Sequence, residues 1–302
     1  MQIAVAATPE VAIPTLELLL KSGKNLVSVI TQPDRPAGRG LTLKETPVAL
    51  WAKERQIPVH KPNSQDELSE IVKSFDLVIT IGFGMIIREE ILSLPKFGFI
   101  NLHFSLLPRW RGAAPVQRAI EAGDAVTGVT VFQLDRGMDT GPIFRQVTVD
   151  IGNGATSESL LSELAEIGAK PVIETIDAIS AGEHPRVQES SGATRANKLS
   201  KEEGRIDWSL PVEVIDRKIR AFYPNPGSWT TFRGAKVKIE KVAIHTGQPG
   251  TPGALSAINR ELVVSCGEGS LKVTELQPSG KPVMAASAWL NGAQLKENER
   301  FE

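Results

Sequence analysis

The sequence predicts an α/β protein whose open, mostly parallel sheet carries helices on both faces and is followed by a small β-barrel. Residues 2–31 have the pattern strand, helix, strand, which is the unit that opens a parallel sheet. Strand and helix patterns then continue as far as residue 180. After residue 227 the pattern changes to short strands separated by turn signals, which is typical of a small closed or half-closed barrel.

In the first part of the chain, strands are expected at short apolar runs, namely 2–6, 26–31, 76–81, 100–104, 128–134 and 143–149. Helices are expected at 9–22, 47–56, 66–74, 115–122 and 157–179, the last interrupted at Pro171. Segment 32–40 contains too much proline and glycine for regular structure, and it carries Arg35 and Arg39. Because loops after strands of such a sheet face the ligand crevice, this loop either closes over a phosphate-bearing substrate or is a surface excursion.

We expect a first domain at 1–180, a polar linker at 181–207 and a second domain at 208–302. The second domain opens with a helix whose apolar stripe consists of Val212, Ile215, Ile219 and Phe222. The opposite face of this helix carries Arg217, Lys218 and Arg220. The short strands that follow are expected at 228–232, 237–244, 262–266 and 271–276. Folds of this class often hold nucleic acid or sugar.

Composition excludes several classes of protein. The 302 residues carry 34 Lys and Arg against 35 Asp and Glu, and a modest basic excess after residue 208 permits a polyanionic partner without requiring one. The single cysteine, Cys266, rules out an internal disulfide and lies in an apolar run typical of a core. The histidines lack metal-ligand spacing, so we expect no metal. Without a membrane-length apolar run or a signal peptide, we expect a cytoplasmic protein with no membrane partner. We also expect a monomer with no obligate protein partner.

Polar and apolar residues alternate in the strand at 100–104, and we expect its polar face to carry the chemistry. Asn101 and His103 share that face, about 6–7 Å apart, so both can approach one small group. Pro108 then turns the chain away, because proline supplies no amide hydrogen to a sheet. Formyl or acyl transfer to an amine needs hydrogen-bond donors for an oxyanion and a group that moves protons, which an amide and an imidazole supply. The alternative is that these are ordinary surface residues.

Two glycine-containing loops flank this strand. The run Gly82-Phe83-Gly84 begins like a dinucleotide fingerprint, but Ile87 stands where the third glycine belongs. This excludes a nicotinamide or flavin enzyme and still allows a flat ligand to approach the backbone. In the second loop, 135–142, Asp139 either makes a turn hydrogen bond to its own backbone or orients His103 and stabilises its charge.

Several motifs resemble the formyltransferases that use 10-formyltetrahydrofolate: Asn101-Leu-His103 with Ser105-Leu106-Leu107-Pro108, Arg111-Gly-Ala-Ala-Pro115, and Asp135-Arg-Gly-Met-Asp139-Thr-Gly-Pro142. The similarity to the methionyl-tRNA formyltransferases extends further, to runs at 31–40, 204–208, 219–222 and 276–281. It therefore covers the chain nearly from end to end. The departures are Ala7, where that family usually has glycine, and the run 194–198, and neither touches the motif residues.

The resemblance implies a Rossmann-like formyltransferase domain followed by an OB-like domain that contacts tRNA. The catalytic residues that it implies are Asn101, His103 and Asp139. The folate site that it implies is lined by Ser105, Leu106, Leu107 and Pro108. From the glycine pattern we expect the backbone of Gly82, Phe83 and Gly84 to contact the same ligand. The tRNA contacts that we expect with it are Arg35 and Arg39 in the loop and Arg217, Lys218 and Arg220 on the helix.

The implied reaction transfers the formyl group of 10-formyltetrahydrofolate to the α-amino group of initiator methionyl-tRNA. Two alternatives stay open. The first is a formyltransferase acting on a small amine, such as glycinamide ribonucleotide or an amino sugar, which needs neither the arginine loop nor the domain after residue 208. The second is a folate-binding or RNA-binding module without enzymatic activity.

Overall fold

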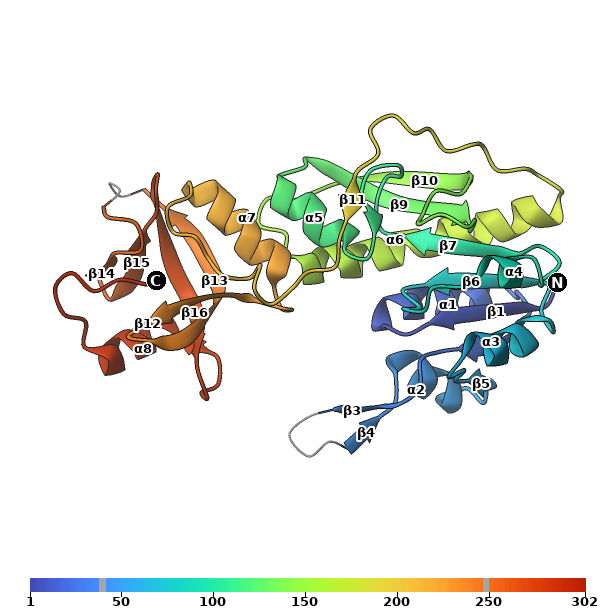
Figure 1. Cartoon of the computed structure of the whole chain (residues 1–302), viewed down its shortest axis with the longest axis horizontal. Coiled ribbons are helices and arrows are strands. Elements are labelled where there is room, and N and C mark those ends of the chain that lie inside the picture. Colours follow the sequence, from blue (N-terminus) through green and yellow to red (C-terminus); the bar gives the residue numbers. More distant parts are fainter. Residues whose placement is uncertain (38–41, 247–249) are drawn as a thin grey trace. The chain divides into compact units, whose positions relative to one another are not determined.

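The computed structural model describes residues 1–37, 42–246 and 250–302, which form two compact units (Figure 1). The first unit comprises Met1–Pro115, Val126–Asp150 and Leu161–Ala196. The second comprises Val116–Ala125, Ile151–Leu160 and Asn197–Glu302. Two segments that precede the C-terminal part of the chain thus belong to the second unit.

A seven-stranded sheet forms the centre of the first unit, in the order β10-β9-β7-β6-β1-β2-β5 (Figure 1). The strands are β1 (Ile3–Ala7), β2 (Leu26–Ile30), β5 (Val59–His60), β6 (Leu77–Ile81), β7 (Phe99–His103), β9 (Val126–Gln133) and β10 (Ile143–Asp150). Five strands run parallel, whereas β9 is antiparallel to β7 and β10 is antiparallel to β9. Every residue of β1 and β6 is buried, so the sheet is covered on both faces there. The predicted open, mostly parallel sheet is confirmed.

The helices that pack in this unit are η1 (Glu10–Ala12), α1 (Ile13–Lys21), α2 (Pro47–Glu54), α3 (Gln65–Val72), α4 (Glu89–Leu92) and most of α6 (Ser157–Ser180). Helices α2 and α3 begin within a residue of their predicted positions, because the hydroxyls of Thr46 and Ser64 accept hydrogen bonds from backbone amides of the first turn. The predicted interruption at Pro171 is wrong. Helix α6 continues through this proline, and the buried side chains of Val172 and Thr175 show that packing of the helix outweighs one lost hydrogen bond.

A two-stranded antiparallel ribbon occupies part of the segment expected to lack regular structure. It consists of β3 (Arg35–Ala37) and β4 (Thr42–Lys44), with Arg35 opposite Lys44. The prediction was wrong for β3, because both strands of such a ribbon are edges, where a proline such as Pro36 needs no amide hydrogen. Arg39 lies outside the described residues.

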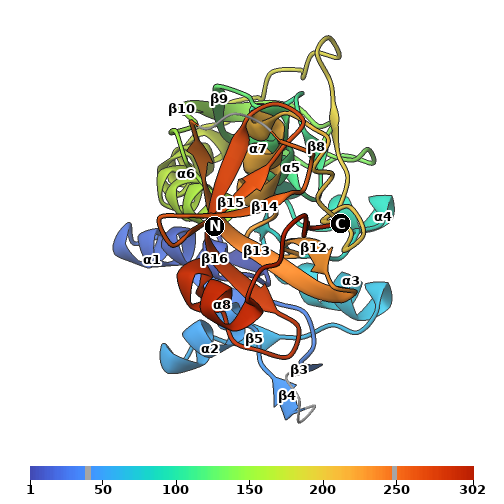
Figure 2. The same ribbon diagram turned by 90° about the vertical axis from the view of Figure 1, so that its left-hand side faces the viewer.

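The second unit contains an antiparallel sheet in the order β12-β13-β16-β15-β14, with β17 beside β16. These strands are β12 (Ser228–Phe232), β13 (Ala235–His245), β14 (Leu255–Ile258), β15 (Glu261–Ser265), β16 (Ser270–Pro278) and β17 (Met284–Ala285). Its helices are α7 (Val212–Phe222), α8 (Ala286–Ala293) and, except for its first residue, α5 (Pro115–Ala122). Helix α8, which the sequence did not suggest, packs on β15 and β16 (Figure 2). The predicted β-domain after a short helix is confirmed.

The core of this unit combines the predicted stripe of α7 with an aromatic cluster near the C-terminus. Val212, Ile215 and Ile219 are all buried in it. The ring of Phe301 lies 5.8 Å from that of Trp208 and 5.9 Å from that of Trp289. Phe301 is therefore part of the core.

Cys266 is fully buried in the same core, and burial raises the pKa of its thiol to about 11. A thiol that is both inaccessible and protonated is not a nucleophile, so Cys266 acts as a small core side chain. In the described part of the chain, no helix has the length and apolar character needed to cross a bilayer.

Replacing Phe301 with alanine should lower the free energy of unfolding of the second unit by about 3–5 kcal/mol, because a fully packed ring would leave a cavity. Urea unfolding followed by tryptophan fluorescence measures this, since two tryptophans contact the ring. The control is Ile258→Ala in the same unit, whose side chain is 43% exposed and whose loss should change stability by less than about 0.5 kcal/mol. Equal losses in the two variants would contradict the assignment of Phe301 to the core.

Candidate active site

Strand β7 presents Asn101 and His103 on one face at its carboxyl end, as the sequence predicted. Asn101 pairs with Thr80 on β6 and with Phe132 on β9, so its position is fixed from both sides. Its side chain is half-buried, and its amide makes no hydrogen bond within the described residues. It is therefore a polar group held in place and available to a ligand.

The imidazole of His103 is 6% exposed and is held on one side by the chain that follows. Its Nε2 lies 2.9 Å from the backbone oxygen of Trp110, and because a carbonyl only accepts, Nε2 carries the proton. Nδ1 faces Oδ2 of Asp139 at 3.8 Å, which is too long for a hydrogen bond and close enough for electrostatic attraction to a protonated ring. The ring is oriented, and its Nδ1 side faces the carboxylate.

The carboxylate of Asp139 does not bond its own loop. Its Oδ2 accepts a hydrogen bond of 2.8 Å from the backbone N–H of Gly112, on a segment 27 residues away. The neighbouring Asp135 makes the local turn bonds instead, with Gly137 N–H at 2.9 Å and the Thr140 hydroxyl at 2.7 Å. Of the two interpretations of Asp139, the turn hydrogen bond to its own backbone is therefore wrong.

Two residues beside the imidazole have a left-handed backbone. Trp110 has a φ of 64° and Asp139 a φ of 55°. This conformation is costly for a bulky residue such as Trp110 and persists only where the surroundings impose it, whereas aspartate adopts it more readily. The backbone N–H of Trp110 donates to the hydroxyl of Thr194 at 2.9 Å, which is one such restraint. The strained backbone at Trp110 is thus held by another part of the chain.

A segment that sequence reasoning treated as part of a linker supplies these restraints. Residues 186–196, which we call the strap, cross the first unit after α6. The strand β11 (Arg195–Ala196) within it pairs with β8 (Arg111–Gly112), and Gln188 donates to the backbone oxygens of Asp139 and Gly141 at 3.2 and 2.9 Å. The strap has no apolar period and carries no motif, so nothing in the sequence pointed to these contacts.

The predicted folate-lining run Ser105–Pro108 follows His103 directly, but its side chains differ in exposure. The Ser105 side chain is fully buried and donates to the backbone oxygen of Arg109 at 2.6 Å. Leu107 is also buried, in a cluster that includes Phe132. Only Leu106 and Pro108 are partly exposed, so they are the side chains of this run that a ligand can contact.

The loop Gly82–Gly84 lies at the carboxyl end of β6, beside β7. Gly82 has a φ of 56°, and a Cβ there would lie 2.8 Å from the Pro9 ring, so the fold itself requires this glycine. Phe83 is 4% exposed and belongs to the core. Gly84 has a φ of 78°, and a Cβ at this position would meet no described atom within 4 Å, which leaves its backbone open to a ligand.

The predicted tRNA-contacting cations differ in how they are engaged. In the ribbon, Arg35 is exposed and donates to Gln32, at 3.2 Å. On α7, Arg220 forms an ion pair with Asp216 at 2.8 Å, and Arg217 donates to the backbone oxygen of Glu121 at 3.3 Å. The Lys218 ammonium lies 5.6 Å from the ring of Phe222 on its own helix. The two helix arginines are thus tied to the fold of the second unit.

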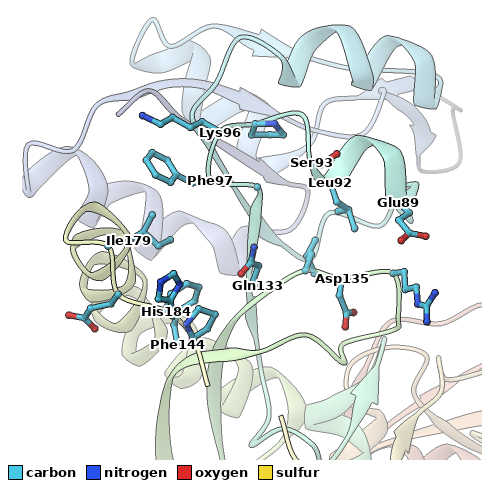
Figure 3. Close-up of a pocket in the computed structure, with 17 residues that line it drawn as sticks. Glu89, Leu92, Ser93, Lys96, Phe97, Gln133, Asp135, Phe144, Ile179 and His184 are labelled. Carbon is cyan, nitrogen blue, oxygen red and sulfur yellow. The ribbon is translucent and has the colours of Figure 1, made fainter. Parts of the chain in front are cut away.

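Two cavities of the first unit lie at different distances from these residues. One of about 360 Å³ adjoins the Asp139 loop and is lined by Arg111, Gly137, Met138, Thr140, Ala193, Thr194 and Arg195. A larger one of about 760 Å³ lies where β7 begins, with Gln133 between Phe144 and His184 on one side and Leu92 and Glu89 on the other (Figure 3). Neither cavity is lined by Asn101, His103 or Asp139. The smaller one is lined by Gly137, Met138 and Thr140, which are neighbours of Asp139 in its loop, so we place the candidate site beside the smaller cavity.

Within the described residues, no group of three His, Cys, Asp or Glu side chains is placed to hold a metal ion. The side chains that the site offers are a free amide, an oriented imidazole and a nearby carboxylate. The amide can donate a hydrogen bond to a developing oxyanion, and the imidazole can move a proton.

Comparison with known proteins agrees with this chemistry. The formyl transferase family matches residues 1–176, and the C-terminal domain of formyl transferases matches residues 198–294. A methionyl-tRNA formyltransferase of Thermobifida fusca (strain YX) is 43% identical, over 100% of this chain and 99% of that protein. One of Stutzerimonas stutzeri (strain A1501) is 46% identical, over 94% of this chain and 92% of that protein.

A solved structure shares the fold. The sugar 3N-formyl transferase WlaRD, in the presence of dTDP and 5-N-formyl-THF, matches with a TM-score of 0.70 over 93% of this chain and 99% of that chain. At 20% identity, this likeness concerns the fold alone. The resemblance indicated by the motifs is thus confirmed by matches that span both units, and the chain belongs to the formyl transferase family, among the methionyl-tRNA formyltransferases.

Proposed function

We propose that this chain transfers the formyl group of 10-formyltetrahydrofolate to the α-amino group of initiator methionyl-tRNA. The observation that carries the proposal is the convergence of Asn101, His103 and Asp139 at the end of β7. The full-length relatives named for this reaction specify the substrate. Because the chain is a formyltransferase, we set aside the binding module without enzymatic activity.

In the proposed reaction, folate supplies the formyl carbon, and the amine forms a bond to it as the bond to folate N10 breaks. The Asn101 amide donates to the formyl oxygen as negative charge develops there. His103 presents Nδ1 to the same region and moves the amine proton toward N10, directly or through a held water. Asp139 keeps the ring oriented and stabilises its charged form.

The residues at the site fit a flat folate ring in two respects. The backbone of Gly84 is open to close approach, and the partly exposed Leu106 and Pro108 offer apolar contact beside His103. Ser105 and Leu107 would act through their backbone, since their side chains are buried. We therefore assign the folate contacts to the side chains of Leu106 and Pro108 and to the backbone of Gly84, Ser105 and Leu107.

For the tRNA, we propose contacts from the arginine loop and from the second unit. Arg35 and Arg39 remain the loop residues, and Lys218 is the candidate on α7, because both arginines of that helix are engaged in the fold. We further propose that the protein acts as a monomer in the cytoplasm, where charged tRNA and folate are both present.

Formylation assays with defined acceptors test the proposed function. Charged initiator tRNA should be formylated in a reaction that depends on 10-formyltetrahydrofolate. Glycinamide ribonucleotide and a nucleotide-linked amino sugar should react far more slowly at equal concentration, because neither would engage the arginine loop or the second unit. Faster formylation of either small amine would overturn the proposal in favour of that substrate.

Replacing Asn101 with alanine should reduce turnover roughly 100- to 1,000-fold, the cost of losing one oxyanion donor. The fold should persist, because the amide makes no hydrogen bond to the described chain. Single-turnover formylation of charged tRNA measures the effect. Asn25→Ala, at an exposed position in the loop before β2, is the matched control and should retain the full rate. A wild-type rate in Asn101→Ala would remove the amide from the mechanism.

Replacing Arg39 with alanine should raise the KM for tRNA and leave kcat unchanged, because we place this residue at the RNA backbone. The slope of log KM against log salt should fall by about 0.7–0.9 for each phosphate that the variant no longer neutralises. Arg35→Ala should act in the same direction. The control is Lys73→Ala, an exposed cation on α3's carboxyl side that pairs with Glu70. An unchanged salt slope in Arg39→Ala would take this arginine out of the interface.

A further inference from the structure

The strap is anchored to the first unit near both of its ends. At its start, Arg186 exchanges two backbone hydrogen bonds with Ile143, of 2.7 and 3.0 Å. At its end, Arg195 and Ala196 pair in register with Arg111 and Gly112. Between these anchors the chain passes beside the loop that carries Asp139. A side chain in the middle of the strap is therefore held at a fixed place.

That side chain is Gln188, and both the nitrogen and the oxygen of its amide make hydrogen bonds. Nε2 donates to the backbone oxygens of Asp139 and Gly141, at 3.2 and 2.9 Å. Oε1 accepts from the Arg111 guanidinium, with Nε at 2.8 Å. Carbonyls only accept and a guanidinium only donates, so the contact requires a group with both functions, which a neutral amide provides.

The Asp139 loop needs such a restraint. Asp139 has a φ of 55°, and the chain turns so closely at Gly141 that a Cβ there would lie 1.8 Å from the Gln133 backbone oxygen. Within the described residues, the other hydrogen bond that holds Asp139 comes from the Gly112 amide to its carboxylate. That bond fixes one oxygen atom and does not fix the backbone from which the carboxylate extends.

We propose that Gln188 is a positioning residue for formyl transfer. It holds the Asp139 backbone so that the carboxylate faces Nδ1 of His103, and it touches neither the amine nor the formyl donor. The inference rests on the proposed function, since it assigns Gln188 to the same reaction. It also gives the middle of the strap a role in catalysis beyond that of a connecting segment.

Three variants test whether the donor function of the Gln188 amide is the one that matters. Gln188→Ala removes both the donor and the acceptor. Gln188→Glu has nearly the same shape and still accepts from Arg111, but it cannot donate to the two carbonyls. Glu189→Ala, at the next position of the strap, alters an exposed side chain without a hydrogen bond in the described chain and serves as the control.

For Gln188→Ala and Gln188→Glu, kcat should fall about 10- to 100-fold, as expected when a catalytic group is displaced by about 1 Å. The KM values for methionyl-tRNA and for 10-formyltetrahydrofolate should change by less than about twofold, because Gln188 contacts neither substrate and its loss should not alter their binding. Glu189→Ala should match the wild type. Thermal unfolding of each variant is measured alongside, and Gln188→Glu carries the test if the alanine variant does not fold.

A double-mutant cycle with Asp139→Asn distinguishes positioning from general support of the structure. If Gln188 acts through Asp139, then adding Gln188→Glu to Asp139→Asn should lower kcat by less than about threefold further, because the two losses are not additive. Fully additive losses, or a wild-type kcat in Gln188→Glu, would overturn the inference. A wild-type enzyme that does not formylate methionyl-tRNA would instead overturn the proposed function, and the cycle is then measured with the amine that it does formylate.

Discussion

The hydrogen bond between His103 Nε2 and the Trp110 backbone oxygen is the constraint on which the site depends. It fixes the proton on one nitrogen of the ring and turns the other toward Asp139. The bond requires Trp110 to adopt a left-handed backbone, which a bulky residue adopts only under restraint. That restraint comes from Thr194, 84 residues later, so the orientation of a residue on β7 depends on the strap.

The mixed sheet explains how groups from three segments meet. The parallel strands β6 and β7 end at the same edge, which places the Gly84 backbone beside Asn101 and His103. Strand β9 runs the other way, with Thr130 opposite His103, and the Thr130 hydroxyl donates to the Ser105 backbone oxygen at 2.6 Å. The antiparallel strand therefore secures the turn after β7, and the loop that follows it returns Asp139 to the imidazole.

The parts of the fold and of the site that depend on a local sequence pattern could be predicted from the sequence. The period of two in β7 places Asn101 and His103 on one face, and the stripe of α7 identifies a buried face of the second unit. Contacts between distant segments have no such signature. Asp135 and Asp139 both lie in the same glycine-containing loop, and only the position of the Gly112 amide decides which one makes the local turn. Helix α6 likewise passes Pro171 because of packing that its own residues do not reveal.

His103 and Asp139 are held by different contacts, and this explains why the imidazole and the carboxylate are not in direct hydrogen-bond contact. His103 is fixed by a strand and by one hydrogen bond, whereas Asp139 is fixed through its backbone and by a single amide on its carboxylate. In the mechanism that we propose, a separation of 3.8 Å leaves Nδ1 able to exchange a proton with a third group while the carboxylate stays nearby. A direct bond would occupy the atom that carries the proton in the proposed mechanism. The oriented ring and the separately held acid are thus compatible with the proton transfer that we propose.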